Sequence, residues 1–234
     1  MRKQQDMEGL MAITTSARFL RNQDLIPQRK LDRIGIVGLG GIGSQLVPLL
    51  SIMGFKKIVG WDYDILEEHN LSTTLYPQNS IGKPKAQIAK NVFSMYGVDP
   101  DGFESYDEKY VESSPTCPKM IVCLDNMEGR LVAYKNWLKQ SSRQFFIDLR
   151  MGALAMEIVT VSKKEDDYMS TWLPTHEIRE EPCTMKHTIF TASIVGGLGV
   201  DQVFNLVAKR PYHAYIWLGL SPITMRTDNL VINV

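Results

Sequence analysis

Residues 33–64 read RIGIVGLGGIGSQLVPLLSIMGFKKIVGWDYD, and this stretch decides the fold. A short apolar run meets a cluster of glycines, an apolar segment of helical length follows, and a second apolar run ends at Asp62. The order predicts a strand, a tight turn, a helix and a second strand with an acid after it. That context is what separates a nucleotide-binding glycine loop from a chance glycine cluster. The stretch therefore predicts a Rossmann-like α/β fold.

Three glycines of this loop have distinct expected roles. Gly38 allows the tight turn, Gly40 lets the backbone approach a phosphate, and Gly43 lets the helix lie close to the strand. The free N–H groups and the dipole at the helix start favour an anion. Asp62 is placed to accept hydrogen bonds from ribose hydroxyls. These features predict a nucleotide site, and taken alone they fit NAD as well as ATP.

The composition is that of a soluble globular protein. The 234 residues are 44% hydrophobic and 22% charged, and Lys+Arg and Asp+Glu are equal at 26 each, so no overall charge favours nucleic acid or an anionic membrane. We expect no membrane-spanning run and no signal peptide. The three cysteines include no CxxC pair, which argues for the reducing cytoplasm and against a disulfide framework or a four-cysteine zinc site.

The periodicity predicts one domain over residues 1–234, with a mostly parallel central sheet flanked by helices and a more antiparallel C-terminal portion. An N-terminal helical arm (1–30) precedes a nucleotide-binding core (31–150) and a C-terminal portion of strands, a loop and a helix (151–234). Beyond the opening stretch, helices are expected over residues 7–21, 86–96, 130–140 and 188–207. Strands are expected within 99–112 and over 120–124, 145–148, 156–161, 213–220 and 229–234.

Two further polar positions point to the same site. Lys85 follows Pro84 at the start of a predicted helix, where a cation opposes the helix dipole. This unfavourable position suggests an anion between Lys85 and the helix amides, although a solvent-facing lysine is an equal alternative. Asp125 follows a buried strand, as Asp62 does, and ligands of open α/β sheets bind beyond the carboxyl ends of strands.

In these residues and in the motifs around them, the chain resembles the ThiF/MoeB family, which shares the adenylating fold of ubiquitin-activating enzymes. The resemblance runs from about residue 18 to residue 209 and rests on several unlinked motifs in order. They are RFLRNQ, GLGGIGS, D-Y-D followed by N-L, G-K-P-K, L-D-N with Arg130 after it, MGALAMEIVTV, and Cys183 before a helix of small residues.

The resemblance implies an enzyme that binds ATP and Mg²⁺ and lets the C-terminal carboxylate of a ubiquitin-like protein or peptide attack the α-phosphate. It implies that Arg21, Lys85, Asp125 and Cys183 are catalytic, with Asp125 holding Mg²⁺ and Arg21 reaching the site of a partner subunit in a homodimer. The implied nucleotide-binding residues are Gly38, Gly40, Gly41, Gly43, Asp62, Asp64, Asn70 and Lys85.

The chain departs from the family pattern in two places. The family usually has an arginine shortly after the Asn-Leu pair, whereas Ser72, Thr73 and Thr74 follow here, so Lys83 is a candidate replacement. The two CxxC pairs that bind zinc in many members are missing. Lys186 and His187 near Cys183 favour a thiolate, and a structural cysteine is the alternative.

Four hypotheses stay open at this point. The leading one is an adenylyltransferase acting on a protein or peptide C-terminus, with transfer to Cys183 as a further step. The second is a partner-binding adaptor with weakened catalysis, suggested by the missing arginine. An NAD-dependent oxidoreductase would explain the glycine loop but not Lys85 or Asp125. The fourth keeps the ATP chemistry and activates a carboxylate on modified tRNA, which the balanced charge does not encourage.

Overall fold

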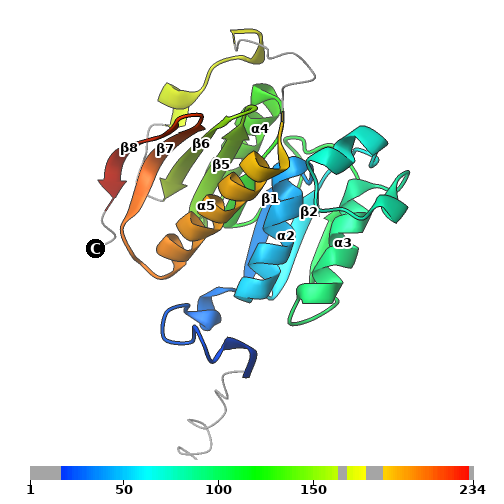
Figure 1. Cartoon of the computed structure of the whole chain (residues 1–234). Coiled ribbons are helices and arrows are strands. Elements are labelled where there is room, and N and C mark those ends of the chain that lie inside the picture. Colours follow the sequence, from blue (N-terminus) through cyan, green and yellow to red (C-terminus); the bar gives the residue numbers. More distant parts are fainter. Residues whose placement is uncertain (1–16, 163–167, 178–186, 232–234) are drawn as a thin grey trace, which may run out of the picture.

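The computed structural model describes residues 17–162, 168–177 and 187–231, and it has one eight-stranded sheet between helices (Figure 1). The strand order is β3-β2-β1-β4-β5-β6-β7-β8. Strands β3 to β5 pair in parallel, and β5 to β8 pair antiparallel. This arrangement confirms the predicted fold class, including the antiparallel C-terminal portion. The strands are β1 Arg33–Val37, β2 Lys57–Trp61, β3 Phe103–Tyr106, β4 Lys119–Val122, β5 Phe145–Met151, β6 Ala155–Ser162, β7 Tyr212–Leu220 and β8 Ile223–Val231.

Two hydrophobic cores lie on opposite faces of the sheet. Helices α2 (Gly41–Met53), α3 (Lys85–Tyr96) and α5 (Ile189–Val207) cover one face, and α4 (Met127–Leu138) covers the other (Figure 1). Successive strand side chains point to opposite faces: Ile36 and Ile58 belong to the first core, whereas Val37 and Val59 belong to the second. Because both faces are covered, the central strands β1, β2 and β4 are apolar after their first residues and show no polar alternation.

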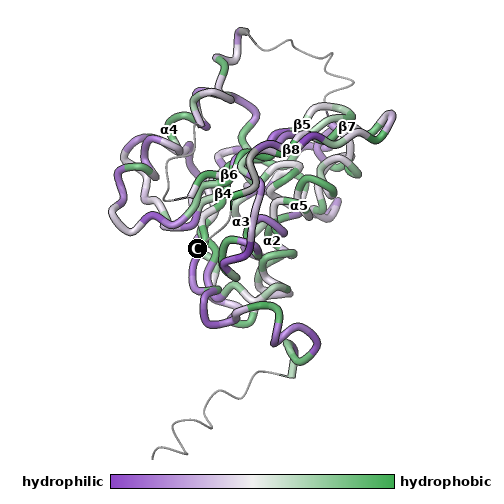
Figure 2. Tube along the Cα trace, turned by 90° about the vertical axis from the view of Figure 1, so that its left-hand side faces the viewer, coloured by the Kyte–Doolittle hydropathy of each residue, from purple (hydrophilic) through white to green (hydrophobic). Residues whose placement is uncertain are grey.

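The long apolar helix α5 packs with one side against α2 and the sheet. Gly196 lies against Gln45 of α2, and Gly199 lies against Leu149 of β5. Figure 2 shows α5 coloured largely hydrophobic. Of the helices in the described part of the chain, α5 is the one long and apolar enough to cross a membrane, so the expectation of no such run fails by length and composition. Core helices of soluble proteins meet the same criterion.

Several predicted boundaries need correction. The helix expected over 7–21 lies mostly outside the described residues, and its described end is a single 3-10 turn, Ala17–Phe19, followed by another at Gln28–Lys30. The last strand begins at Ile223 instead of Asn229, because a two-residue turn, Ser221-Pro222, joins it to β7. The polar segment Thr224–Asp228 hid this strand, since at an exposed edge both faces tolerate polar side chains.

The described N-terminal segment lies at the carboxyl ends of α2 and α3. The Arg18 guanidinium donates to the carbonyl oxygens of Tyr96, Gly97 (3.3 Å) and Ser51 (3.5 Å), which are acceptors left over at helix C-termini. Phe19 is buried beside Gly54, which follows α2. The glycine loop is at the other end of α2, about 20 Å away at 1.5 Å per residue. The segment and the loop therefore lie at opposite ends of the molecule.

Candidate functional site

The glycine loop is a tight turn clamped by its neighbours. Gly38 has a positive φ of 92°, and a Cβ there would lie 2.7 Å from the Cys123 carbonyl oxygen. A Cβ at Gly43 would lie 2.2 Å from the carbonyl oxygen of Gly38, so the helix approaches the strand as expected. Within the described part of the chain, a Cβ at Gly40 would meet no atom within 4 Å. The loop is thus packed at both ends and open in the middle.

The start of α2 is arranged to receive an anion. Gly40 is the residue that precedes the helix, and among the described residues no side chain caps its amides. The first turn also carries no acid. The first amides of a helix have no carbonyl partner within it, and together with the dipole they form a phosphate-binding end. Ser44 does not compete, because its hydroxyl donates back to Gly41 (2.9 Å) and accepts from the Leu75 amide (3.1 Å).

Asp62 holds the loop from the end of β2. Its carboxylate accepts from the amides of Leu39 (2.6 Å) and Asp64 (2.9 Å), and it is 9% exposed. Burial raises the pKa of this carboxyl, and the two amide hydrogen bonds oppose the rise. Each oxygen keeps a second lone pair, so the predicted contact with ribose hydroxyls stays a prediction. The structure adds a second task for Asp62, which is to fix the peptide of Leu39.

Lys85 is buried at the first position of α3 and has an anionic partner. Its ammonium lies 2.8 Å from the Asp64 carboxylate, and the Lys85 amide donates to the Asp64 carbonyl oxygen (2.9 Å). The lysine is 7% exposed, whereas the Asp64 side chain is about half exposed. The anion expected beside Lys85 is therefore supplied here by the chain itself. A pocket of about 150 Å³ opens at this pair and is lined by Asp64, Ile65, Glu67, His69, Asn70 and Lys85.

Asn70 enters this pocket from a short 3-10 helix, Glu68–Ser72. Its side-chain oxygen accepts from the Glu67 amide (3.0 Å) as part of a capping box. The oxygen thus fixes the start of the 3-10 helix, and a role of Asn70 in nucleotide binding stays a prediction. Further on, Thr73 lies against Gly41, whose added Cβ would be 3.4 Å from the Thr73 carbonyl oxygen. The segment that lacks the family arginine therefore packs on the start of α2 through its backbone.

Asp125 lies exposed just beyond β4, and its carboxylate accepts from the side-chain amide of Asn126 (3.1 Å). Strands β2 and β4 flank β1, so Asp125 and the Asp62–Asp64 pair stand on either side of the glycine loop. The negative charge of Asp64, then desolvation, and then the charge of Asp125 raise the pKa of Tyr63. In the described ranges, three or more His, Cys, Asp or Glu side chains are nowhere grouped so that they could hold a metal ion by themselves. A single exposed carboxylate suits Mg²⁺, which binds through few protein ligands and the phosphates of its nucleotide.

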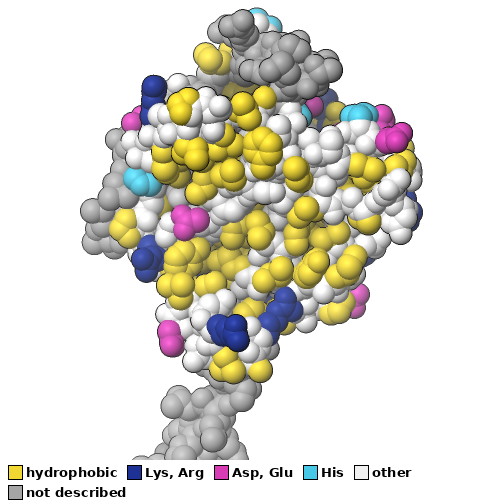
Figure 3. Space-filling view, viewed as in Figure 1, with side chains coloured by type: hydrophobic (Ala, Val, Ile, Leu, Met, Phe, Trp, Pro, Cys, Tyr) yellow, Lys and Arg dark blue, Asp and Glu magenta, His cyan; other side chains and the backbone are white. Residues whose placement is uncertain are grey.

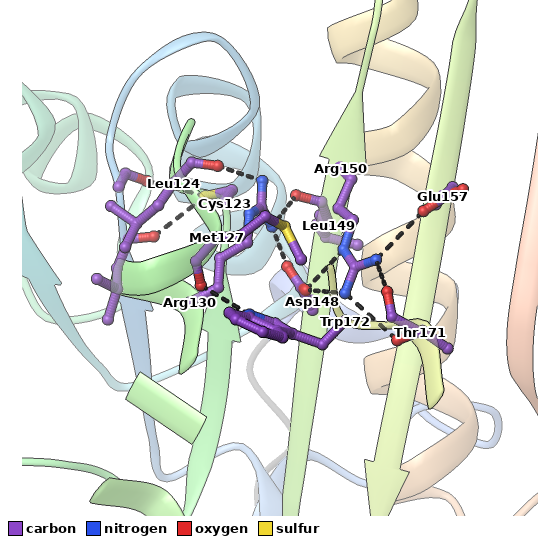
Figure 4. Close-up of polar contacts among 12 residues, drawn as sticks. Cys123, Leu124, Met127, Arg130, Asp148, Leu149, Arg150, Glu157, Thr171 and Trp172 are labelled. Carbon is purple, nitrogen blue, oxygen red and sulfur yellow. Dashed lines mark hydrogen bonds and ion pairs between the residues drawn. The ribbon is translucent and has the colours of Figure 1, made fainter. Parts of the chain in front are cut away.

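A buried ionic cluster beneath Asp125 was not predicted. Asp148 of β5 is completely buried, and its carboxylate accepts from Arg130, from Arg150 (2.8 Å) and from the Tyr168 hydroxyl (2.9 Å), as Figure 4 shows for the two arginines. Arg150 also pairs with Glu157 at 3.3 Å. A signal was available, since Asp148 is the third acid near the carboxyl end of a parallel strand after Asp62 and Asp125. From the sequence, Asp148 was interpreted only as the last residue of a strand.

Of the other two predicted catalytic residues, Arg21 lies away from this site and Cys183 is not among the described residues. Arg21 is exposed on the N-terminal segment, at the far end of α2 from the glycine loop. Cys183 lies outside the described residues, so its predicted role stays a prediction. Of the other two cysteines, Cys117 is buried and Cys123 is partly buried. Desolvation raises the pKa of the Cys117 thiol and raises that of Cys123 to about 12. Such thiols stay protonated near pH 7 and are poor nucleophiles.

The comparisons with known proteins agree with this architecture. The model of the ThiF family matches residues 18–226, and the chain belongs to the ThiF family. It is similar to ubiquitin-like modifier-activating enzyme 5 of Caenorhabditis elegans, with 27% identity over 115 residues, 42% of this chain and 27% of that protein. The enzyme 5 of Dictyostelium discoideum is 28% identical over 137 residues, 51% of this chain and 33% of that protein. The chain thus matches a third or less of the length of these curated relatives.

Solved structures share the fold. Escherichia coli MccB with MccA-N7isoASN has a TM-score of 0.75 at 17% identity, covering 91% of this chain and 72% of that one. MccB with ATP has a TM-score of 0.70 at 17% identity, covering 87% and 65%. PaaA has a TM-score of 0.70 at 17% identity, covering 87% and 66%. At such identities the likeness concerns the fold alone.

Proposed function

We propose that the protein is an ATP-dependent adenylyltransferase that activates the C-terminal carboxylate of a ubiquitin-like protein or peptide. The observation that carries the proposal is the placement of Lys85 and Asp125 on opposite sides of an open glycine loop. A phosphate at the α2 amides would have a cation on one side and a metal-binding carboxylate on the other. Membership of the ThiF family supports this function. The similarity to ubiquitin-like modifier-activating enzyme 5 supports it too. So does the shared fold with MccB, which has been solved with ATP and with MccA.

The reaction needs positioning and charge neutralisation more than covalent help. An oxygen of the partner's carboxylate forms a bond to the α-phosphorus, and the bond from that phosphorus to the bridging oxygen of the β-phosphate breaks. Pyrophosphate leaves and an acyl-adenylate remains. No general base is required, since a C-terminal carboxylate is ionised near pH 7. The α2 amides and Lys85 bind the phosphates, and Asp62 with Leu39 keeps the loop in place. Magnesium bound at Asp125 would offset the negative charge on the phosphates.

Two alternatives have an observation in their favour. A partner-binding adaptor is favoured by the absence of an arginine after Leu71, with Lys83 exposed and not seated in the pocket. An NAD-dependent oxidoreductase is favoured by the glycine loop with Asp62. It gives no reason to bury Lys85 beside the loop, because NAD carries a pyrophosphate and no third phosphate. Activation of a carboxylate on modified tRNA keeps the same site chemistry but has no support from the overall charge.

Calorimetry with nucleotides distinguishes these functions. We expect ATP with Mg²⁺ to bind and NADH to give no heat, since Lys85 and Asp125 favour a triphosphate with its metal. ATP–pyrophosphate exchange with a panel of peptides ending in glycine would then separate the enzyme from the adaptor. Binding of NADH without binding of ATP would overturn the proposal, and binding of ATP with no exchange for any carboxylate would favour the adaptor.

We propose that the functional unit is a homodimer in which Arg21 serves the partner's site. Arg21 lies about 20 Å from its own glycine loop by the length of α2, too far for its side chain to cross. Hydrophobic side chains gather on the face formed by α5 and α2 (Figure 3), where Leu49, Ile52 and Phe190 are exposed. A twofold contact across this face would bring the arm of each subunit towards the loop of the other.

This arrangement predicts complementation between two inactive variants. Arg21→Ala and Asp125→Asn should each lose exchange activity, because each removes one cationic or metal-holding group from every site. After subunit exchange in an equimolar mixture, half the dimers are mixed and each has one intact site, so roughly a quarter of wild-type activity should return. Steady-state exchange rates of the mixture against each variant alone measure this. A mixture as inactive as its components would contradict a role for Arg21 across the dimer.

Transfer to Cys183 is a further proposed step. A thiolate there would attack the acyl carbon and expel AMP, forming a thioester. The high pKa values of Cys117 and Cys123 leave these two described thiols unsuited to the step. Cys183→Ser should therefore keep the exchange reaction and abolish any thiol-sensitive conjugate with the partner. A conjugate that survives the substitution would end this part of the proposal.

A further inference from the structure

The side chain of Arg130 connects the ends of two strands beneath the proposed metal site. It reaches from the first turn of α4 and donates to the carbonyl oxygens of Leu124 and Leu149 (3.0 Å for the latter). It also pairs with the carboxylate of Asp148. Figure 4 shows Arg130 between the Leu124 segment and β5. Arg130 is 5% exposed and Asp148 is wholly buried, so solvent does not screen this pair.

Leu124 directly precedes Asp125, which makes this contact important for the site. A hydrogen bond to the Leu124 carbonyl oxygen fixes the orientation of the peptide group that leads into Asp125. Just before it, the Cys123 amide donates to Val37 (2.9 Å), and just after it, Asn126 accepts from the Gly129 amide (2.7 Å). The Asp125 carboxylate itself is exposed and touches the side chain of Asn126. Its place is therefore set by the backbone on both sides.

Asp148 in turn fixes the guanidinium. The carboxylate has three partners, Arg130, Arg150 and Tyr168, so its acceptor sites are well used. The planar fork of arginine can serve Asp148 and two carbonyl oxygens at once. A lysine would keep the charge but could not reach all three acceptors in this geometry.

We propose that Arg130, held by Asp148, is a positioning residue for Asp125 and thereby sets the metal affinity of the nucleotide site. The inference rests on the proposed function, since it takes Asp125 to hold the metal of a bound nucleotide. Residues that orient metal ligands without touching the metal typically change its affinity by 10- to 100-fold when they are replaced.

Binding of Mn²⁺ and of ATP, measured separately, tests the proposal. Free Mn²⁺ is followed by electron paramagnetic resonance with ATP equimolar to the protein and is compared with the same titration of ATP without protein. ATP binding is measured by calorimetry in EDTA. For Arg130→Lys we expect Mn²⁺ affinity to fall by about tenfold, while ATP affinity in EDTA changes by less than about twofold, because metal-free binding does not use Asp125. The matched control is Tyr168→Phe, which removes one partner of Asp148 but leaves both arginines, and it should bind Mn²⁺ like the wild type.

The outcomes separate this inference from the proposed function. A folded Arg130→Lys protein with wild-type Mn²⁺ affinity would overturn the positioning role alone. If that variant does not fold, the double variant Arg130→Gln/Asp148→Asn replaces it, because removing both charges leaves no unpaired buried ion between the two positions. The same loss of Mn²⁺ affinity is expected there, and unchanged affinity again overturns the role. A wild-type protein that binds no ATP at all would overturn the proposed function, and this inference with it.

Discussion

Asp125→Asn is expected to reduce the rate of partner-dependent ATP–pyrophosphate exchange by about a thousandfold, since a metal ion supplies several kcal/mol of charge stabilisation to such a reaction. Asparagine keeps the size of the side chain and its contact with Asn126, but it lacks the anionic oxygen that Mg²⁺ prefers. Because Asp125 is exposed, the substitution should not change the midpoint of thermal unfolding. Initial rates at saturating ATP over a range of Mg²⁺ concentrations provide the measurement.

Glu128→Gln is the matched control for this experiment. Glu128 is also an exposed acid near the start of α4, and its carboxylate pairs with Thr175 instead of facing the glycine loop. It should retain the wild-type exchange rate. If Asp125→Asn also retains it, at the same Mg²⁺ dependence, the assignment of Asp125 as the metal ligand is wrong.

Alanine substitutions in the glycine loop should separate folding from binding. Gly43→Ala places a methyl group 2.2 Å from the backbone oxygen of Gly38, so either the helix or the turn must move. We expect the free energy of unfolding to fall by about 1–3 kcal/mol, as for other overpacked sites, and ATP binding to be lost with the loop geometry. Chemical denaturation measures the first effect and calorimetry the second.

Gly40→Ala should give the opposite pattern. An added methyl group meets no described atom within 4 Å, so the stability should stay near the wild-type value. The methyl group would occupy the space beside the α2 amides where a phosphate is expected, and ATP affinity should fall about tenfold or more. If Gly40→Ala binds ATP as tightly as the wild type, the phosphate lies elsewhere.

Residues 33–64 were sufficient to predict the fold class because they combine two short apolar runs, a glycine turn and a helical apolar segment in one order. Lys85 and Asp125 could also be placed, since both mark ends of elements where ligands of α/β sheets bind. The partner of Lys85 could not be predicted, because Asp64 lies 21 positions earlier in the sequence and local patterns do not indicate contacts over that separation. The same holds for Asp148, whose partners Arg130 and Tyr168 come from different elements.

The edges of the sheet were predicted less well, for a physical reason. Central strands such as β4 are apolar on both faces and stand out in the sequence. The last strand, β8, is paired on one side only and is exposed over much of its length. It is therefore not enriched in apolar residues as a buried strand is. The pairing of β8 with β7 depends on the turn between them. The polar residues within β8 are typical of a loop, so the sequence did not predict a strand there.

If Lys85 binds the nucleotide as we propose, the Lys85–Asp64 pair would make that binding an exchange of one anion for another. The ammonium has a carboxylate beside it before any phosphate arrives, so ATP must displace one anion by another and cannot simply add to a bare cation. Most of the attraction between Lys85 and the nucleotide is thereby offset. A displaced Asp64, whose side chain is half exposed, would then be a negative charge without its cation at the end of β2. Lys85 would then distinguish triphosphates from shorter nucleotides, because only a phosphate group that displaces the Asp64 carboxylate would pair with the ammonium.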